Sequence, residues 1–440
     1  MARRWAADAR SGEQIEVAVS RSTSTHVRAY KGEVESFTSA TGFGVGIRVV
    51  VDGRQGFAHA GTFDEAVLRE TLADARDNAR LTEPDEWAGL ALPDGVAAVE
   101  QDLWNPAVTS TAAERKVALA LDLEREVLGL DGRVKGVQSC SYGDTASEFA
   151  VAASTGVRAS GRSTSCWMSV SALAEDSGET QVGYGVDVGR DPEMLDLAKV
   201  ADEAVVRATR LLGARKAPSQ RLSLLLDAKQ AAVILGIVAG TLTGDVVLKQ
   251  RSPFADRVGH AVASPQLTLL DDPTNPASMA ADIFDGEGLA CRRNVLIDRG
   301  VLQGFLQNSY TGRRSGTAST GSAVRSARSL PGVGVQAMAV APGDRSWDDL
   351  LAGIHTGLYV QSMHGLHSGV NATSGDFSVG VEGLMIRDGE LAEPVREVTI
   401  ASTLQRLLQD IAAVGADVEW LPSGAGCPPL LVDEVSLSGS

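Results

Sequence analysis

Apolar and polar residues alternate along the first part of the chain, and this pattern predicts β-hairpins followed by a helix. The clearest hairpin joins residues 46–51 to residues 54–58 through Asp52-Gly53, a dipeptide that suits a type I′ turn. Residues 62–79 then carry apolar side chains at helical spacing. The side chains predicted to share the buried face of this helix are Val67, Leu68, Leu72 and Ala75.

Further apolar runs in the first half are short and are separated by residues that favour turns. The predicted strands cover residues 15–20, 25–30, 33–38, 134–141, 147–152 and 162–172, with turns at Lys31-Gly32, Gly143-Asp144 and Thr155-Gly156. Two more helices are predicted. One opens at Thr111, where Thr111 and Glu114 have the spacing of a capping box, and the other covers residues 192–212.

The basic, proline-containing segment 213–220 is the predicted boundary between two domains, at residues 1–215 and 216–440. A chain of 440 residues is longer than one compact core usually supports, so two domains are the natural expectation.

Strand patterns dominate the second half of the chain. It begins with an apolar strand at residues 221–226, and Asp227 can cap a helix that ends near Gly240. Two amphipathic helices are predicted at residues 346–356 and 399–414. We therefore predict an α+β fold of two domains, with mostly antiparallel sheets and flanking helices, in which the second domain is richer in β-structure.

The charge balance argues against two classes of partner. The formal net charge is −16 and the basic residues are scattered, whereas binding to nucleic acid or to an anionic membrane needs clustered Lys and Arg. No stretch approaches the roughly 18 apolar residues of a membrane span, and no apolar run marks a signal peptide. The four cysteines are too far apart for a disulfide framework or a zinc knuckle. We expect a cytoplasmic protein without a nucleic-acid or membrane partner.

Motifs for nucleotide or nucleophile chemistry are absent or weak. Gly42, Gly44 and Gly46 lead into a strand and not into a helix N-terminus, so they favour close β packing over phosphate binding. The chain has neither a Walker-type loop nor a GxSxG motif.

Metal ligation has equally little support. None of the six histidines is followed by glutamate. His364 and His367 have HxxH spacing, but we expect them in a Gly/Ser-rich loop and not on a helix. Acidic turns at residues 270–273 and 284–288 could chelate a hard cation, yet such turns are more often solvated loops or caps. The densest polar cluster is the loop at residues 363–378, whose composition is common at binding sites.

Collinear blocks along nearly the whole chain resemble the TldD/PmbA family. The C-terminal blocks lie at residues 365–371, 374–378, 382–383, 389–390, 398–400 and 414–417, with a late cysteine at Cys427. The upstream blocks lie at residues 42–58, 271–273, 284–288, 300–302, 309–310 and 319–321. The resemblance implies a metallopeptidase-type frame with a TldD/PmbA-type C-terminal domain.

The family resemblance also implies two branches that form a heterodimer, one of which carries a zinc-binding HExxxH on a helix. In this chain Leu235 and Gly240 stand at the positions of the two histidines, and Gly236 stands at the position of the glutamate. Leu and Gly offer no side-chain ligand for zinc, and Gly236 cannot accept a proton from water. The chain therefore resembles the TldE (PmbA) branch, for which no zinc is expected in this subunit.

Three functions follow as hypotheses. The first is a subunit that is inactive alone, pairs with a TldD-like homologue bearing HExxxH and zinc, and helps to form a cavity for unfolded or small modified peptides. The second is a stand-alone peptide-binding or modulator protein, and the third is an independent hydrolase that uses His364, His367 and an acidic residue. The predicted substrate-binding residues are His364, His367, Asn371, Ser374, Asp376 and Ser378.

Overall fold

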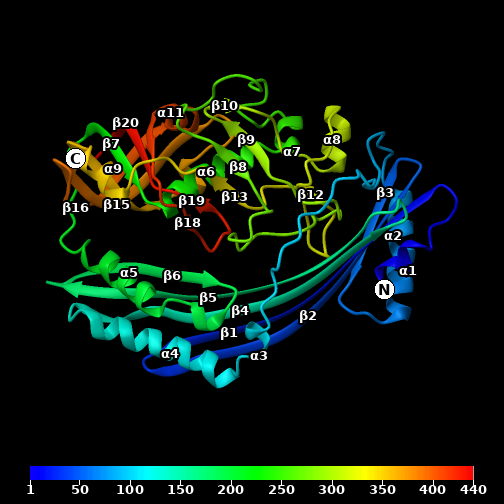
Figure 1. Cartoon of the computed structure of the whole chain (residues 1–440), viewed down its shortest axis with the longest axis horizontal. Coiled ribbons are helices and arrows are strands. Elements are labelled where there is room, and N and C mark those ends of the chain that lie inside the picture. Colours follow the sequence, from blue (N-terminus) through cyan, green and yellow to red (C-terminus); the bar gives the residue numbers. More distant parts are fainter. Residues whose placement is uncertain (440) are drawn as a thin grey trace.

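A long, curved antiparallel sheet forms most of the N-terminal half and runs beneath the C-terminal half (Figure 1). The structure, a computed structural model, describes residues 1–439. The strands of this N-terminal sheet lie in the order β3-β2-β1-β4-β5-β6, and every neighbouring pair is antiparallel. They are β1 (Glu13–Tyr30), β2 (Glu33–Val51), β3 (Arg54–Ala60), β4 (Val134–Ala153), β5 (Arg158–Asp176) and β6 (Glu179–Gly189).

These strands are longer than predicted because residues that favour turns lie inside them. Gly143 and Asp144 are in the middle of β4, so the turn predicted there is wrong. A Cβ at position 143 would lie 2.5 Å from the ring of Trp167, its cross-strand neighbour, so the packing requires glycine. Asp144 instead forms a buried ion pair with Lys116 at 2.6 Å. The predicted turns at Lys31-Gly32, Asp52-Gly53 and Thr155-Gly156 are confirmed.

Helices α2 (Glu65–Leu81), α4 (Ala113–Leu130) and α5 (Leu197–Thr209) pack on this sheet. The buried face of α2 includes Leu68, Leu72 and Ala75 as predicted, but Val67 lies outside it and is 38% exposed. The remaining helices of this half are α1 (Ala2–Ala6), α3 (Ala107–Ser110) and the 3₁₀ helix η1 (Pro192–Met194).

The capping box predicted at Thr111 and Glu114 does not form. Helix α4 begins at Ala113, and its N-cap Ala112 makes no side-chain hydrogen bond. The hydroxyl of Thr111 donates to the carbonyl of Ala107 at 2.7 Å instead. It therefore satisfies the end of α3 rather than the start of α4.

Two larger sheets and a small hairpin build the C-terminal half. One sheet has the order β16-β15-β14-β7-β20-β17 and the other β10-β9-β8-β13-β19-β18, and only the pairs β14–β7 and β13–β19 are parallel within these two orders among residues 1–439. The first comprises β7 (Gln220–Leu226), β14 (Thr356–His364), β15 (Asp376–Arg387), β16 (Glu390–Thr403), β17 (Ile411–Val414) and β20 (Leu430–Ser438). The second comprises β8 (Leu269–Asp271), β9 (Asn294–Asp298), β10 (Val301–Leu302), β13 (Met338–Val340), β18 (Glu419–Trp420) and β19 (Gly426–Cys427), and the hairpin is β11 (Ala323–Val324) with β12 (Gly332–Val333).

Helix α6 (Ala228–Thr241) contacts strands of both sheets and contributes to the main hydrophobic core. Its predicted cap is confirmed, because a carboxylate oxygen of Asp227 accepts from the backbone N–H of Gln230 at 2.9 Å. The other helices of this half are α7 (Gly244–Leu248), α8 (Ser309–Ser315), α9 (Trp347–Ala352), α10 (Leu366–Gly369) and α11 (Leu404–Gln409). The α+β class with mostly antiparallel sheets is confirmed.

The helix predicted at residues 399–414 is wrong for most of its length. Residues up to Thr403 continue β16, because they pair with β15 and β20 on its two sides, and only α11 is helical. The helix predicted at 346–356 is real but shorter, since Thr356 already begins β14. In both places the ladder of a neighbouring strand overrides the local helical pattern.

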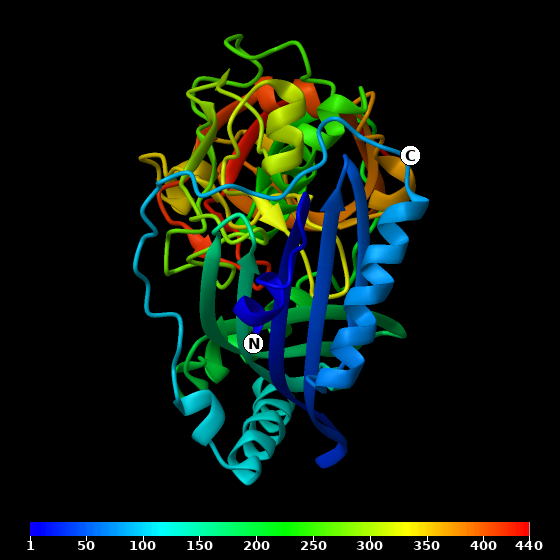
Figure 2. The same cartoon turned by 90° about the vertical axis from the view of Figure 1, so that its right-hand side faces the viewer.

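Buried ion pairs join the two halves, and so does the segment between α2 and α3. Glu16 of β1 pairs with Arg325, and Arg48 of β2 lies 3.5 Å from Glu287, all four side chains being at most 4% exposed. The segment between α2 and α3 passes over the C-terminal half before it descends to α3 (Figure 2). Among residues 1–439, no helix is long and apolar enough to cross a membrane.

Candidate functional site

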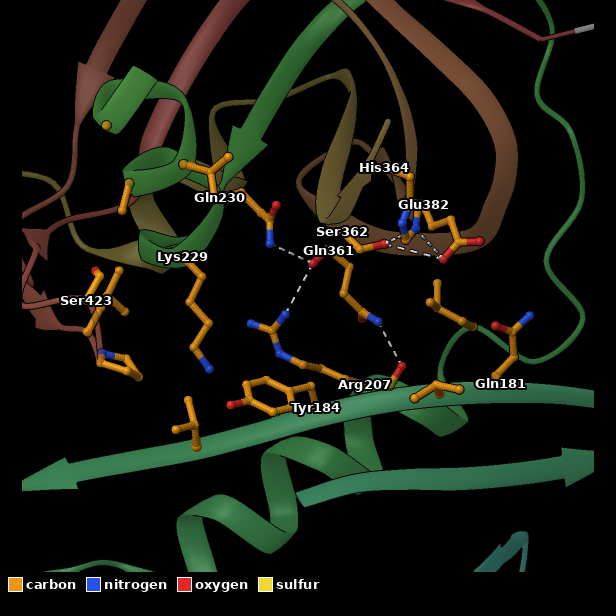
Figure 3. A pocket seen from close by; sticks show the side chains of 18 of the residues that line it. Gln181, Tyr184, Arg207, Lys229, Gln230, Gln361, Ser362, His364, Glu382 and Ser423 are labelled. Atoms are coloured by element: carbon orange, nitrogen blue, oxygen red, sulfur yellow. Dashed lines mark hydrogen bonds and ion pairs between the residues drawn. The ribbon is translucent and has the colours of Figure 1, made fainter. Parts of the chain in front are cut away.

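A cleft of about 1030 Å³ lies at the junction of the two halves. One wall comes from β6 and α5, and the other comes from α6, the β14–β15 hairpin and the loop after β18 (Figure 3). The residues that line it are Thr180, Gln181, Val182, Tyr184, Val186, Arg207, Leu211, Lys229, Gln230, Ala232, Val233, Gly236, Ile237, Gln361, Ser362, His364, Glu382, Leu421, Pro422 and Ser423.

The wall formed by β6 is apolar because of the way this strand alternates. Gly183 and Gly185 face α5, where a Cβ at either position would lie 2.0 Å from a helix carbonyl. Successive strand residues point to opposite faces, so Val182 and Tyr184 point into the cleft, where they are 45% and 47% exposed. Strand β6 is also the last strand of its sheet, and its outer edge has no strand partner among residues 1–439.

The opposite wall is the exposed face of α6, on which Gly236 contributes no side chain. Gly236 lines the cleft and Gly240 is exposed one turn further on, and a Cβ at either position would meet open space. Leu235 points the other way and is 1% exposed in the main core. Of the three positions where the resemblance placed the zinc motif, only Gly236 lines the cleft.

The residues around α6 do not fit a bound zinc ion. Leu235, Gly236 and Gly240 carry no donor atom, and the nearby Cys427 is buried in the same core as Leu235. Burial raises the pKa of the Cys427 thiol, which disfavours the thiolate that would ligate a metal. Across residues 1–439, no three His, Cys, Asp or Glu side chains are grouped so that they could hold a metal ion.

The acidic turns considered as cation sites have structural partners instead. Asp271 is fully buried, and one of its oxygens accepts from the backbone N–H groups of Gln336 and Ala337 at 2.9 and 2.7 Å. Asp285 accepts from three backbone N–H groups, and Glu287 accepts from that of Ser309. These carboxylates therefore order loops of the fold.

A polar group of three side chains lies at one end of the cleft. Ser362 and Glu382 are direct cross-strand neighbours on β14 and β15. The Ser362 hydroxyl donates to Oε2 of Glu382 at 3.3 Å and lies 3.1 Å from Nε2 of His364, which is itself 3.4 Å from the same Oε2. Serine and carboxylate thus meet the same ring nitrogen. A Ser-His-acid relay requires them on opposite nitrogens, so this arrangement lacks the geometry of a hydrolase triad.

Two basic side chains, Arg207 and Lys229, also line the cleft and are paired with carboxylates. Arg207 contacts Asp227 at 2.6 Å and Glu203 at 2.9 Å, and Lys229 also pairs with Glu203. Burial disfavours the charge on Arg207, but Asp227 and Glu203 outweigh this effect and raise its pKa. Figure 3 shows Arg207 reaching towards Gln361, and the hydrogen bond between them connects α5 to β14.

Only one of the six substrate-binding residues predicted from the sequence, His364, lines the cleft. The others lie in the connection from β14 to β15 and at the start of β15. Asn371 accepts from the N–H groups of Thr373 and Ser374, and Ser374 donates to Asp376, so these side chains stabilise turns. His367 lies on the short helix α10 rather than in an irregular loop. His367 and Ser378 do not line the cleft either.

The cleft residues that sequence reasoning missed are Tyr184, Arg207, Lys229, Gln361 and Ser362. Glu382 belonged to a block noted for the family resemblance, but nothing marked it as part of a site. No local pattern distinguishes these side chains from ordinary surface positions, because β14 lies far along the chain from β6 and α5.

Three family models match successive parts of this chain. They are PmbA/TldA metallopeptidase domain 1 at residues 15–79, the central domain at residues 107–212 and the C-terminal domain at residues 219–439. Metalloprotease PmbA of Escherichia coli O157:H7 is 29% identical over 96% of this chain and 92% of its own length. The metalloprotease TldD homologue of Haemophilus influenzae is 28% identical over 90% and 87%. The crystal structure of TldE from Thermococcus kodakarensis has the same fold, with a TM-score of 0.89 and 24% identity over 97% of each chain.

Proposed function

Because this chain belongs to the PmbA/TldA metallopeptidase family, we propose that it is the zinc-free subunit of a two-chain peptidase and helps to form the cleft that receives the peptide. The observation that carries the proposal is the exposed face of α6. It has no metal-binding side chain at positions 236 and 240, yet it still forms one wall of a large cleft. The chemistry then belongs to a partner that bears HExxxH and zinc, and this chain is inactive alone.

The cleft has features that suit an extended peptide. The outer edge of β6 offers unpaired backbone groups, to which a peptide can add as a further strand. Val182 and Tyr184 provide apolar contacts, and Ser362 provides a polar group on the opposite wall. An edge of this kind binds main chain rather than one particular side chain, which suits unfolded or modified peptides.

A second free edge supports pairing with a homologous chain. Strand β3 pairs with β2 only from Val45 to Val51, so the part of β2 before Val45 has no strand partner on its outer side among residues 1–439. Val34 and Phe37 on this part are 41% and 44% exposed. A long, exposed edge with apolar side chains favours association with another chain. We assign this edge to the partner subunit.

Co-expression with a TldD-like homologue that carries HExxxH tests the proposal. We expect a mixed dimer by sedimentation, one zinc per dimer by mass spectrometry, and peptidase activity on an unstructured peptide only when both chains are present. Stoichiometric zinc together with peptidase activity in this chain alone would refute the proposal. Peptide binding without any pairing would instead identify a stand-alone peptide-binding protein.

A further inference from the structure

Glu382 is the one acidic residue among those that line the cleft. Every other lining residue is apolar, neutral or basic, and among residues 1–439 His364 is the only titratable side chain within hydrogen-bonding distance of Glu382. The carboxylate is partly sheltered, since 29% of its side chain is exposed. A sheltered charge interacts more strongly than one in open solvent, because less water screens it.

The basic residues of the cleft do not neutralise Glu382, because their own partners lie behind them. Arg207 is bound by Asp227 and Glu203, and Lys229 is bound by Glu203. Arg210, behind Gln361, is engaged by the side-chain oxygens of Gln361 and Tyr359. No salt bridge joins Glu382 to any Lys or Arg among residues 1–439.

One carboxylate oxygen of Glu382 is available for a ligand. Ser362 and His364 both contact Oε2, whereas no residue from 1 to 439 donates a hydrogen bond to Oε1. Figure 3 shows the three side chains together at one end of the cleft. Val182, Val233 and Ile237 line the same cleft, and their apolar surface suits the methylene stem of a long side chain.

On the basis of the proposed function, the geometry points to Glu382 as the residue that selects peptides with a positively charged group. An ammonium or guanidinium group donates to the free oxygen while its aliphatic part lies on the apolar wall. The group can come from a lysine or arginine side chain or from a free amino terminus, and both sources use the same chemistry.

Three versions of a fluorescent pentapeptide, Ala-Val-Lys-Val-Ala, separate these sources. The first has a blocked amino terminus and a free lysine, the second has a blocked terminus and acetyl-lysine, and the third has acetyl-lysine and a free terminus. Titrated against the full chain, the first or third version should bind about tenfold more tightly than the second, as one charge-assisted hydrogen bond predicts. Whichever version gains this preference identifies the source of the charge.

Glu382→Gln should remove the preference, and Glu382→Lys should reverse it in favour of a pentapeptide with glutamate at the centre. Glu70→Gln, an exposed glutamate on α2 outside the cleft, is the matched control and should retain the preference. If the wild-type chain binds all three versions equally and Gly236→Trp abolishes this binding, the role of Glu382 is overturned. The proposed peptide cleft then stands. Failure of every version to bind the chain or its complex would overturn both.

Discussion

Gln361 of β14 and Arg207 of α5 each bind the backbone of the other. Nε2 of Gln361 donates to the carbonyl of Arg207 at 2.8 Å, and Nη1 of Arg207 donates to the carbonyl of Gln361 at 3.2 Å. This reciprocal pair joins the two walls of the cleft across residues that are 154 positions apart. The width of the cleft is therefore set by bonds between the halves, and not by either half alone.

Removing the side chain of Gln361 should weaken this junction. Gln361→Ala loses the bond to the Arg207 carbonyl and leaves Nε of Arg210 without its acceptor, which should lower the free energy of unfolding by about 2 kcal/mol. Urea unfolding followed by circular dichroism measures the change. Gln303→Ala, at an exposed position outside the cleft, should change stability by less than about 0.5 kcal/mol. Equal effects of the two substitutions would argue against a special role for the junction.

Filling the cleft from α6 should block peptide binding without damaging the fold. A Cβ at position 236 meets open space, so Gly236→Trp places an indole in the cleft without a backbone clash. We expect peptide affinity to fall at least about tenfold, because the bulky ring occupies the binding volume. Gly240→Trp is the matched control, because Gly240 is equally open but does not line the cleft. Similar losses for both variants would place peptide binding elsewhere.

The same position offers a stability test. Gly236→Ala should raise the free energy of unfolding by about 0.5–1 kcal/mol, since alanine restricts the unfolded chain and favours the helix. Thermal or urea unfolding detects this gain. A loss of stability instead would mean that the α6 face is more crowded than its open surroundings indicate.

Asp271 should make stability depend on pH. Burial raises its pKa to about 6, whereas two backbone N–H groups only partly offset this effect. Between about pH 4 and pH 6 the folded state keeps a proton that the unfolded chain releases, so stability falls as pH rises through this window. The full contribution is about 3 kcal/mol.

Asp271→Asn should remove this slope, because the amide oxygen still accepts from the two N–H groups but cannot ionise. Relative to the wild type, the variant should gain stability from pH 4 to pH 7 in urea unfolding measured at each pH. Asp256→Asn, at an exposed position, controls for the loss of one carboxylate. Parallel curves for Asp271→Asn and the wild type would contradict the assignment.

A charge on the free part of β2 should disrupt pairing with the partner. Phe37 is 44% exposed, so Phe37→Lys should change the stability of the isolated chain by only about 0.5 kcal/mol. Lysine on an edge strand opposes pairing with another chain, and we expect the mixed dimer to dissociate at least about tenfold more readily in sedimentation experiments. Val206→Lys, at a 40% exposed position on α5, should leave the dimer intact. An unchanged dimer with Phe37→Lys would move the interface away from this edge.

Local features of the chain were predictable where a few neighbouring residues decide the structure. The Asp52-Gly53 turn adopts positive φ at both residues, as its type requires, and Asp227 caps α6 through a neighbour three residues away. The family resemblance and the lack of metal donors at Leu235, Gly236 and Gly240 were likewise available from the sequence, because they depend on residue identity alone. The boundary between two domains near residue 215 stays a prediction.

The sequence by itself thus determined the turns at Lys31-Gly32, Asp52-Gly53 and Thr155-Gly156, the cap of α6, the α+β class and the absence of metal donors at positions 235, 236 and 240. Tertiary structure alone decided that Gly143 lies within a strand, since only the ring of Trp167 explains it. It also decided the site, because Tyr184, Gly236 and Glu382 come from β6, α6 and β15 and share one cleft only after the two halves pack together. The physical reason is range: turns and caps depend on bonds a few residues apart, whereas a cleft depends on contacts between segments that no local pattern connects.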